Sequence, residues 1–174
     1  MSEHYILKRP ADLPVTKRDL AEGYQMTVWR PTLTQLVPPG LPKARSAFFW
    51  FVNTLSASPA GGMFMILVHG PEGDVACWCR SMPRFFRFPF FGADDVLLHD
   101  IWTDENHRGK GLASFTLGTF CEVTAAPDRT QWALISKDNA PSLGLFRKFG
   151  FEVDGEVERR TRLGTGAMGY WERV

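Results

Sequence analysis

Glycines and basic residues alternate in one short segment, a combination typical of anion-binding loops. The segment reads Leu98-His99-Asp100-Ile101-Trp102-Thr103-Asp104-Glu105-Asn106-His107-Arg108-Gly109-Lys110-Gly111-Leu112-Ala113. An apolar run ends in a polar turn, and the glycine-containing loop then opens onto an amphipathic stretch over Leu112–Val123. A strand, a loop and a helix in this order leave the first N–H groups of the helix without intrahelical partners. Together with the helix dipole, these donors predict a site for a phosphate or pyrophosphate.

The individual loop residues fit this prediction. Gly109 and Gly111 let the backbone approach an anion closely or adopt a positive φ, and Arg108 and Lys110 add full positive charges. The loop is not a Walker motif, because Lys110 is followed by Gly111 rather than by Ser or Thr. It is not a dinucleotide fingerprint either, because Ser114 stands where that pattern has Gly or Ala. A short connection whose glycines only relieve steric crowding remains the alternative.

A second segment, further along the chain, predicts a strand followed by a capped helix. Gln131–Ser136 suits a short strand, and Asp138 or Asn139 can cap the helix after it. Pro141 falls in the first turn, where its missing N–H is not needed. Gly150 is a suitable C-terminal cap. The apolar positions with helical spacing are Leu143, Phe146 and Phe149.

The two segments together resemble the GNAT superfamily of acyl-CoA N-acyltransferases. Arg108-x-x-Gly111-x-Ala113 matches the pyrophosphate loop of that family. Asn139-x-x-Ser142-x-x-x-Phe146-x-Lys148-x-Gly150-Phe151 matches its second motif, with Phe146 where the family usually has tyrosine. The match is close over residues 96–157 and extends elsewhere only by strand order. The resemblance implies an α/β fold with a central mixed β-sheet of six to seven strands flanked by helices.

The resemblance also implies the ligand, which is acetyl-CoA acting as acyl donor. The N–H groups of residues 109–114 would hold the pyrophosphate of coenzyme A, and the backbone of residues 101–103 would pair with its pantetheine arm. One amide of that strand would bind the thioester carbonyl oxygen, and Asn139 would contact the cofactor in addition to capping a helix. The implied cofactor-binding residues are Ile101, Trp102, Thr103, Arg108, Gly109, Lys110, Gly111, Leu112, Ala113, Ser114 and Asn139.

The implied reaction transfers an acetyl or other short acyl group to the primary amine of a small molecule, by direct attack in a ternary complex. A primary amine has a pKa near about 10, so a base must remove its proton. His99 is the candidate catalytic base, because strand alternation would place it on one face with Ile101 and Thr103. An imidazole also changes its charge near neutral pH. Asp100 would face the other side and is the second candidate, and a structural histidine is the alternative role for His99.

Phe146 removes one catalytic group that the family usually has. A phenyl ring cannot protonate the departing thiolate as tyrosine can, although a thiolate is a tolerable leaving group near neutral pH. Tyr170, in the last expected strand, could substitute or could simply pack. A non-catalytic acyl-CoA-binding or regulatory module on the same fold therefore stays open.

The acceptor site is expected at the segment Met82–Gly92, which combines five phenylalanines with arginines. Arg84 or Arg87 could pair with a phosphate or carboxylate of the acceptor. Packing against the aromatic stretch at Phe48–Phe51 and a dimer interface are the alternatives. The loop is also similar to that of acyltransferases acting on amino sugars, although Ile101-Trp102-Thr103 lacks their cysteine.

Length and composition favour a single domain over residues 1–174. Hydrophobic residues make up 44% and charged residues 22% of the chain, as in ordinary soluble proteins. A net charge of +1 gives no long-range attraction to nucleic acid or membranes; a homodimer stays open. The three cysteines have no ligand cluster around them, so we expect them to be buried, with no disulfide framework and no metal. The chain has neither a signal-peptide core nor a long apolar run, which favours a cytoplasmic location.

The expected elements suit a mixed sheet with helices on both faces. Residues 1–22 are expected to form a strand or an N-terminal arm, and Lys43–Leu55 a helix. Turn residues at His69–Gly73 predict a hairpin between two of the strands. The expected strands are Gln25–Trp29, Gly62–Val68, Asp74–Arg80, Val96–Thr103, Thr130–Ser136, Phe151–Val157 and Met168–Arg173.

Overall fold

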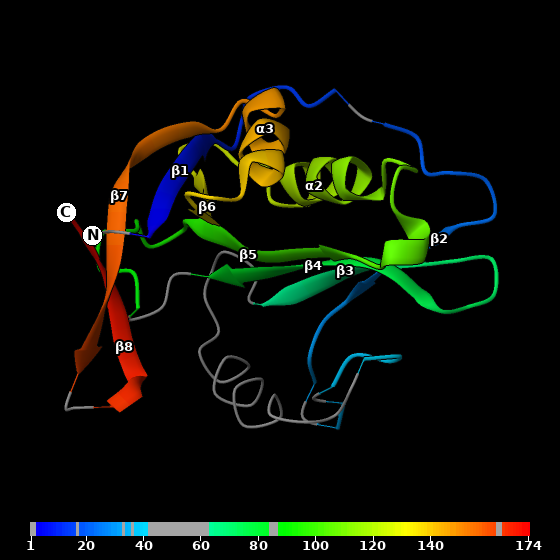
Figure 1. Cartoon of the computed structure of the whole chain (residues 1–174), viewed down its shortest axis with the longest axis horizontal. Coiled ribbons are helices and arrows are strands. Elements are labelled where there is room, and N and C mark those ends of the chain that lie inside the picture. The colour runs from blue at the N-terminus through cyan, green and yellow to red at the C-terminus, as the bar shows by residue number, and fades with distance from the viewer. Residues whose placement is uncertain are drawn as a thin grey trace.

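Eight strands form one twisted sheet, with the order β2-β3-β4-β5-β6-β1-β7-β8. The computed structural model describes residues 3–16, 18–32, 34–35, 37–41, 63–83, 87–162 and 165–174 (Figure 1). The strands are β1 (His4–Pro10), β2 (Gln25–Trp29), β3 (Phe64–His69), β4 (Val75–Pro83), β5 (Val96–Thr103), β6 (Thr130–Ser136), β7 (Glu152–Arg162) and β8 (Thr165–Arg173). The described helices are the 3-10 turn η1 (Glu105–His107), α2 (Leu112–Val123) and α3 (Ala140–Lys148).

The sheet is mixed, as the sequence predicts. Strands β5 and β6 are parallel, and every other neighbouring pair is antiparallel. The strand count exceeds the expected six to seven because of β1, which lies between β6 and β7 rather than extending as an arm. All seven expected strands are present, although β7 and β8 begin or end several residues beyond their predicted limits.

The two α-helices of the described residues, α2 and α3, cover the same face of the sheet (Figure 1). Leu117 and Phe120 of α2 and Leu143 of α3 pack in one buried cluster with side chains of β1, β3, β4, β5 and β6. The predicted helix over Lys43–Leu55 lies outside the described residues, so helices on both faces remain a prediction. Within the described chain, no helix combines the length and hydropathy that a membrane crossing requires.

The opposite face carries a second buried cluster, built largely from aromatic rings. Phe88 and Phe91 stack on each other with centroids 4.7 Å apart, and Phe91 stacks on Trp132 of β6 at 4.8 Å. The second half of the segment Met82–Gly92, from Phe88 to Phe91, therefore packs in the core. Phe48–Phe51, the expected packing partner, lies outside the described residues. The three cysteines are free and buried, as expected.

A buried arginine fixes β1 in the middle of the sheet. Arg9 is 1% exposed, and its guanidinium donates to the Phe149 carbonyl at 2.7 Å, the Gln131 side-chain oxygen at 2.7 Å and the Leu13 carbonyl at 2.6 Å. These acceptors come from the end of α3, from β6 and from the segment after β1. One side chain thus connects three separate parts of the chain.

We expect Arg9→Met to lower the free energy of unfolding by at least about 3 kcal/mol, because several buried acceptors would lose their donor at once. Chemical denaturation measures this quantity. Lys8→Met is the matched control, since the Lys8 side chain is 49% exposed and its ion pair with Asp154 should contribute less than about 1 kcal/mol. Equal losses in the two variants would contradict a stabilising role for the Arg9 network.

Candidate active site

The parallel strands β5 and β6 separate after a short paired stretch. Their register runs from Val96 opposite Gln131 to Leu98 opposite Ala133 and then stops. A cavity of about 150 Å³ lies where they diverge. Its wall consists of Leu98, His99, Asp100, Ile101, Leu134, Ile135, Ser136, Asn139, Ser142 and Phe146. The second half of β5 therefore presents backbone groups toward β6 with no paired strand to bond them, which suits an extended ligand with amide groups.

A β-bulge in β5 lies at this cavity. Arg80 of β4 pairs with Asp100, and the next residue, Ser81, pairs with Leu98, which leaves His99 without a partner across the ladder. Leu98 and Ile101 consequently pack against the same cluster, which strict alternation would forbid. The expectation that alternation separates His99 from Asp100 is therefore wrong, because a bulge adds one residue and bends the strand.

The bulge brings three ionisable side chains together. The Nδ1 atom of His99 lies 2.8 Å from Oδ2 of Asp100 and 2.9 Å from Nη2 of Arg80, and Arg80 and Asp100 form an ion pair. A proton on Nδ1 allows the imidazole and Arg80 both to donate to the carboxylate. With Nδ1 protonated, Nε2 carries the free lone pair; in the other tautomer Nδ1 would instead accept a hydrogen bond from Arg80 at 2.9 Å.

The carboxylate in this cluster is held in its charged form. Burial acts to raise the pKa of Asp100, but the hydrogen bond and charge of His99 and the charge of Arg80 outweigh it, so the pKa lies below the ordinary value. An ionised Asp100 orients the ring and stabilises an imidazolium if Nε2 takes up a proton. The cluster can therefore act as a general base.

The predicted anion loop has the expected backbone geometry. Gly109 and Gly111 have φ values of 79° and 76°, and α2 begins at Leu112 without a side-chain cap or an acidic residue in its first turn. A cavity of about 310 Å³ faces this helix start and is lined by Arg18, Thr103, His107, Arg108, Gly109, Gly111, Leu112, Ala113 and Ser114. The uncapped N–H groups and the two glycines fit the pyrophosphate of coenzyme A.

Side chains from distant parts of the chain complete the loop. Lys110 Nζ donates to the Tyr24 hydroxyl at 2.8 Å, this hydroxyl lies 2.8 Å from His107 Nδ1, and His107 Nε2 lies 2.9 Å from Asp74 Oδ2. Arg18 places its guanidinium over Gly111, where a Cβ would come within 2.6 Å of it. The sequence analysis missed Arg18, Tyr24 and Asp74, since no motif connects them to the loop.

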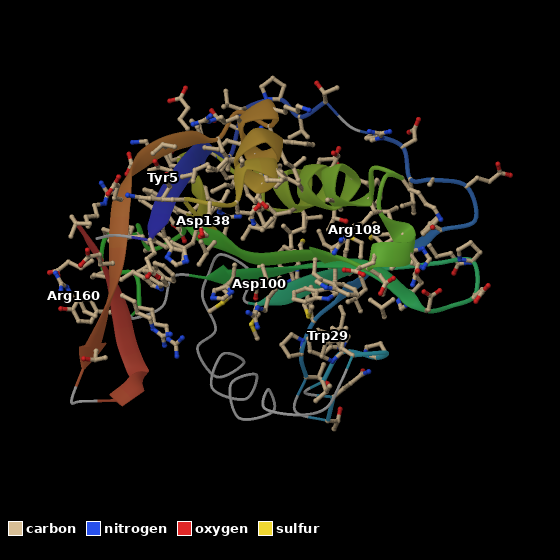
Figure 2. The ribbon with its side chains drawn as sticks, viewed as in Figure 1. Tyr5, Trp29, Asp100, Arg108, Asp138 and Arg160 are labelled. Atoms are coloured by element: carbon tan, nitrogen blue, oxygen red, sulfur yellow. The ribbon has the colours of Figure 1, made fainter. Side chains whose placement is uncertain are left out.

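Of the other predicted cofactor-binding residues, some line one of the two cavities and others have side chains that contact neighbouring residues instead. Figure 2 shows Asp100 on β5 and Arg108 in the segment that leads from β5 to the start of α2. Arg108 borders the loop cavity, but its side chain is 62% exposed and pairs with Glu105 at 3.4 Å. The Trp102 ring stacks on Trp78 of β4 and is 41% exposed. Thr103 donates to the Cys77 sulfur at 3.3 Å.

Asn139 and Phe146 lie in the wall of the cavity between β5 and β6. Asn139 accepts a hydrogen bond from Ser142 N at 3.2 Å and so caps α3. Phe146 is buried, with its ring edge-on to Phe151. Tyr170 lies on β8, opposite Arg160, four strands away from β5 in the sheet order. Within the described part of the chain, no tyrosine lines this cavity.

The sequence matches a known protein family and two named relatives. A model of the acetyltransferase (GNAT) family matches residues 28–151. The L-methionine sulfoximine/L-methionine sulfone acetyltransferase of Pseudomonas aeruginosa is 34% identical over 70 residues, which cover 40% of this chain and 41% of that protein. The chain thus aligns with less than half of that relative's length. YwnH of Bacillus subtilis, named provisionally as a phosphinothricin acetyltransferase, is 30% identical over 131 residues, covering 74% of this chain and 73% of that protein.

A solved structure shares the fold. The tandem GNAT protein from the clavulanic acid biosynthesis pathway superposes with a TM-score of 0.64 at 13% identity, over 87% of this chain and 50% of that one.

We expect Gly111→Ala to weaken coenzyme A binding at least about 10-fold, because alanine disfavours by about 1–2 kcal/mol the positive φ that the anion-binding loop conformation requires, and because a Cβ would displace the Arg18 guanidinium from the loop. Calorimetry with coenzyme A measures the effect. Gly73→Ala is the control, since Gly73 has a φ of 83° but a Cβ there would meet nothing within 4 Å. Unchanged affinity in Gly111→Ala would contradict the assignment of this loop.

The lowered pKa of Asp100 predicts a specific response to acid. An aspartate in the unfolded chain has a pKa near about 3.9, and the folded value is lower. Asp100 therefore stabilises the fold fully above that unfolded value, and this contribution is lost as the pH falls through the folded value.

We expect the free energy of unfolding of Asp100→Asn to fall less steeply than that of the parent below about pH 5. Urea unfolding between about pH 7 and pH 3 measures it, with Asp94→Asn at an exposed position as control. Parallel profiles for the parent and Asp100→Asn would show that the ion pair is not formed in solution.

Proposed function

This chain belongs to the GNAT acetyltransferase family, and we propose that it transfers an acetyl or other short acyl group from acyl-CoA to the primary amine of a small molecule. The observation that carries the proposal is the position of β5. Its N-terminal half is paired with β6, its bulge holds the His99–Asp100–Arg80 cluster, and its end leads through the glycine loop to the uncapped start of α2. A donor site and a base thus lie along one strand.

The donor would lie along the open edge of β5. Main-chain groups of Ile101, Trp102 and Thr103 would bond the pantetheine arm, and the N–H groups from Gly109 to Ser114 would hold the pyrophosphate, with charge from Lys110 and Arg18. Asn139, in the wall of the cavity, would add a side-chain contact. Acetyl-CoA supplies the thioester carbon that the amine attacks. A β5 amide near the bulge would stabilise negative charge on its carbonyl oxygen.

His99 would remove the proton of the attacking amine through Nε2. Asp100 would keep the opposite nitrogen protonated and would stabilise the imidazolium that forms, in the way that a carboxylate supports a catalytic histidine elsewhere. Arg80 would hold the carboxylate in place. Removal of a general base usually lowers the rate by a factor of about 10²–10⁴.

Phe146 leaves the departing thiolate without a tyrosine proton donor. A coenzyme A thiolate is stable enough to leave near neutral pH, so transfer can proceed, and the proton can come from water. The same observation favours a second candidate, a module that binds acyl-CoA without turnover. The two candidates differ only in whether thiol is released in the presence of an amine.

The named substrates of the relatives support a small amine as acceptor. One relative is named for L-methionine sulfoximine and L-methionine sulfone and another for phosphinothricin. An amino sugar is the other acceptor that the loop sequence suggests.

We expect release of free thiol from acetyl-CoA with at least one amine of a panel containing L-methionine sulfone, phosphinothricin and glucosamine. His99→Ala should lower kcat at least about 100-fold with little change in the Kd for coenzyme A, because the ring does not contact the pyrophosphate loop. His69→Ala, at the far end of β3, is the control. Tight coenzyme A binding without thiol release on any amine would favour the binding module.

A further inference from the structure

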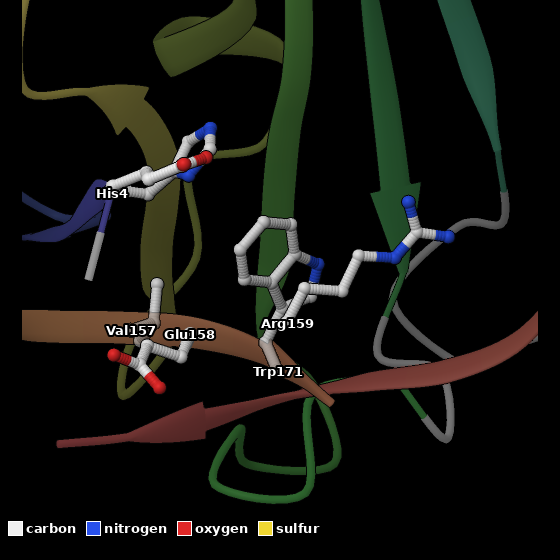
Figure 3. A pocket seen from close by; sticks show the side chains of 6 residues that line it. His4, Val157, Glu158, Arg159 and Trp171 are labelled. Carbon is white, nitrogen blue, oxygen red and sulfur yellow. The ribbon is translucent and has the colours of Figure 1, made fainter. Parts of the chain in front are cut away.

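Two cavities of the described chain differ in what holds their walls in place. The cavity in Figure 3, of about 550 Å³, is lined by Glu3, His4, Val157, Glu158, Arg159 and Trp171. Most of these residues belong to β1, β7 and β8, so the backbone ladder of the sheet fixes them. The cavity at the glycine loop is different, because residues 108–111 lie between η1 and α2 and belong to neither. This loop therefore needs side-chain contacts to hold it in an anion-binding conformation.

The hydroxyl of Tyr24 connects the two sides of the glycine loop. It accepts a hydrogen bond from Lys110 Nζ at 2.8 Å and lies 2.8 Å from His107 Nδ1. His107 and Lys110 flank Arg108 and Gly109, and Gly109 has a φ of 79°. One hydroxyl thus spans the positive-φ turn, in the way that a hydrogen bond across a tight turn keeps its two ends together.

The two charged groups at the ends of this chain of side chains set the direction of its hydrogen bonds. A lysine ammonium can only donate, so the Tyr24 oxygen accepts from Lys110. At the other end, the Asp74 carboxylate can only accept, and its Oδ2 lies 2.9 Å from Nε2 of His107. A neutral His107 therefore carries its proton on Nε2 and accepts the Tyr24 hydroxyl proton at Nδ1. All three hydrogen bonds then run in one direction, from Lys110 to Asp74.

Packing fixes Tyr24 and His107 in this arrangement. The Tyr24 ring packs against one buried cluster, formed by Val68, Ala76, Cys77, Leu112 and Phe115. It also meets the His107 ring edge-on, with centroids 5.7 Å apart. The His107 side chain is 14% exposed, and a Cβ on Gly70 would come within 2.9 Å of its Cε1 atom. The hydroxyl is thus held in place before any ligand arrives.

We propose that Tyr24 is a positioning residue for acyl-CoA, and that it preorganises the loop at residues 108–111 by bonding His107 and Lys110. This inference rests on the proposed acyl transfer. The described residues that line the loop cavity include Arg18 but not Lys110, so Lys110 contributes to binding mainly through its bond to the hydroxyl. A preorganised loop binds more tightly because it loses less conformational entropy when the pyrophosphate is bound.

Removal of the hydroxyl tests the proposal. Tyr24→Phe keeps the ring and its packing, so the fold should be retained. We expect the Kd for coenzyme A to rise about 5- to 30-fold by calorimetry. The KM for acetyl-CoA should rise by a similar factor, with kcat within about twofold of the parent value. Without ligand, the NMR order parameters of the amides at residues 109–111 should fall from about 0.85 to below about 0.6.

Tyr5→Phe is the matched control and should change none of these quantities. The Tyr5 ring lies on β1, and Lys137 Nζ lies over it at 5.2 Å, as Lys110 Nζ lies over the Tyr24 ring at 5.3 Å. The same substitution is thus made beside a similar lysine, away from the glycine loop.

A double variant tests whether Tyr24 acts through Lys110. Lys110→Met should raise the Kd for coenzyme A at least as much as Tyr24→Phe does. Adding Tyr24→Phe to Lys110→Met should then raise the Kd by less than about threefold more, because residues in one hydrogen-bond network are not additive. Full additivity of the two substitutions would overturn the proposal.

The outcomes separate this inference from the proposed function. If no amine is acetylated, but the Kd for coenzyme A and the order parameters respond to Tyr24→Phe as expected, the positioning role is supported although acyl transfer has failed. Unchanged coenzyme A affinity in Tyr24→Phe, or a loop as rigid as that of the parent, would overturn the positioning role even if amines are acetylated. A parent protein that binds no coenzyme A would overturn both.

Discussion

The short parallel contact between β5 and β6 creates the opening at which the candidate site lies. Only residues 96–98 and 131–133 are paired, and beyond them β5 turns away with its backbone unbonded on one side. Buried or half-buried backbone groups need partners, so the opening is useful only to a molecule that can hydrogen-bond along a strand. The bulge at His99 contributes to the opening and also gathers the ionisable side chains. The bulge in β5 thus accounts both for part of the opening between β5 and β6 and for the clustering of ionisable side chains beside it.

Most of the fold could be predicted from the sequence, because apolar runs and turn residues are local signals. The β3–β4 hairpin, β5, α2, β6 and α3 all lie close to their predicted limits. Strand β1 was harder to predict from the sequence. Its apolar pair Ile6 and Leu7 is followed by Lys8 and Arg9, two charged residues that suggest a surface segment. Arg9 is buried only because acceptors from β6 and the end of α3 surround it, and nothing local in the sequence reveals those partners.

In the candidate site, too, features set by neighbouring residues could be predicted from the sequence, and features set by distant contacts could not. The glycine loop and the start of α2 follow from neighbouring residues, so their backbone conformation was predictable. The contributions of Arg18, Tyr24 and Arg80 depend on contacts across the fold. The position of His99 failed the alternation argument for the same reason, because a bulge arises from the pairing of two strands and not from the sequence of one. Residues that act together here are mostly distant along the chain.

The central position of β1 has a consequence for biosynthesis. Its partners Thr130–Ser136 and Glu152–Val157 emerge from the ribosome long after His4–Pro10 has been made. Until then the apolar side chains of β1 have no sheet to join, and the contacts that complete the sheet are long in sequence separation, which slows folding. Until residues 130–157 are made, the nascent protein must keep an unpaired strand from aggregating, and chaperone protection is most valuable in this period.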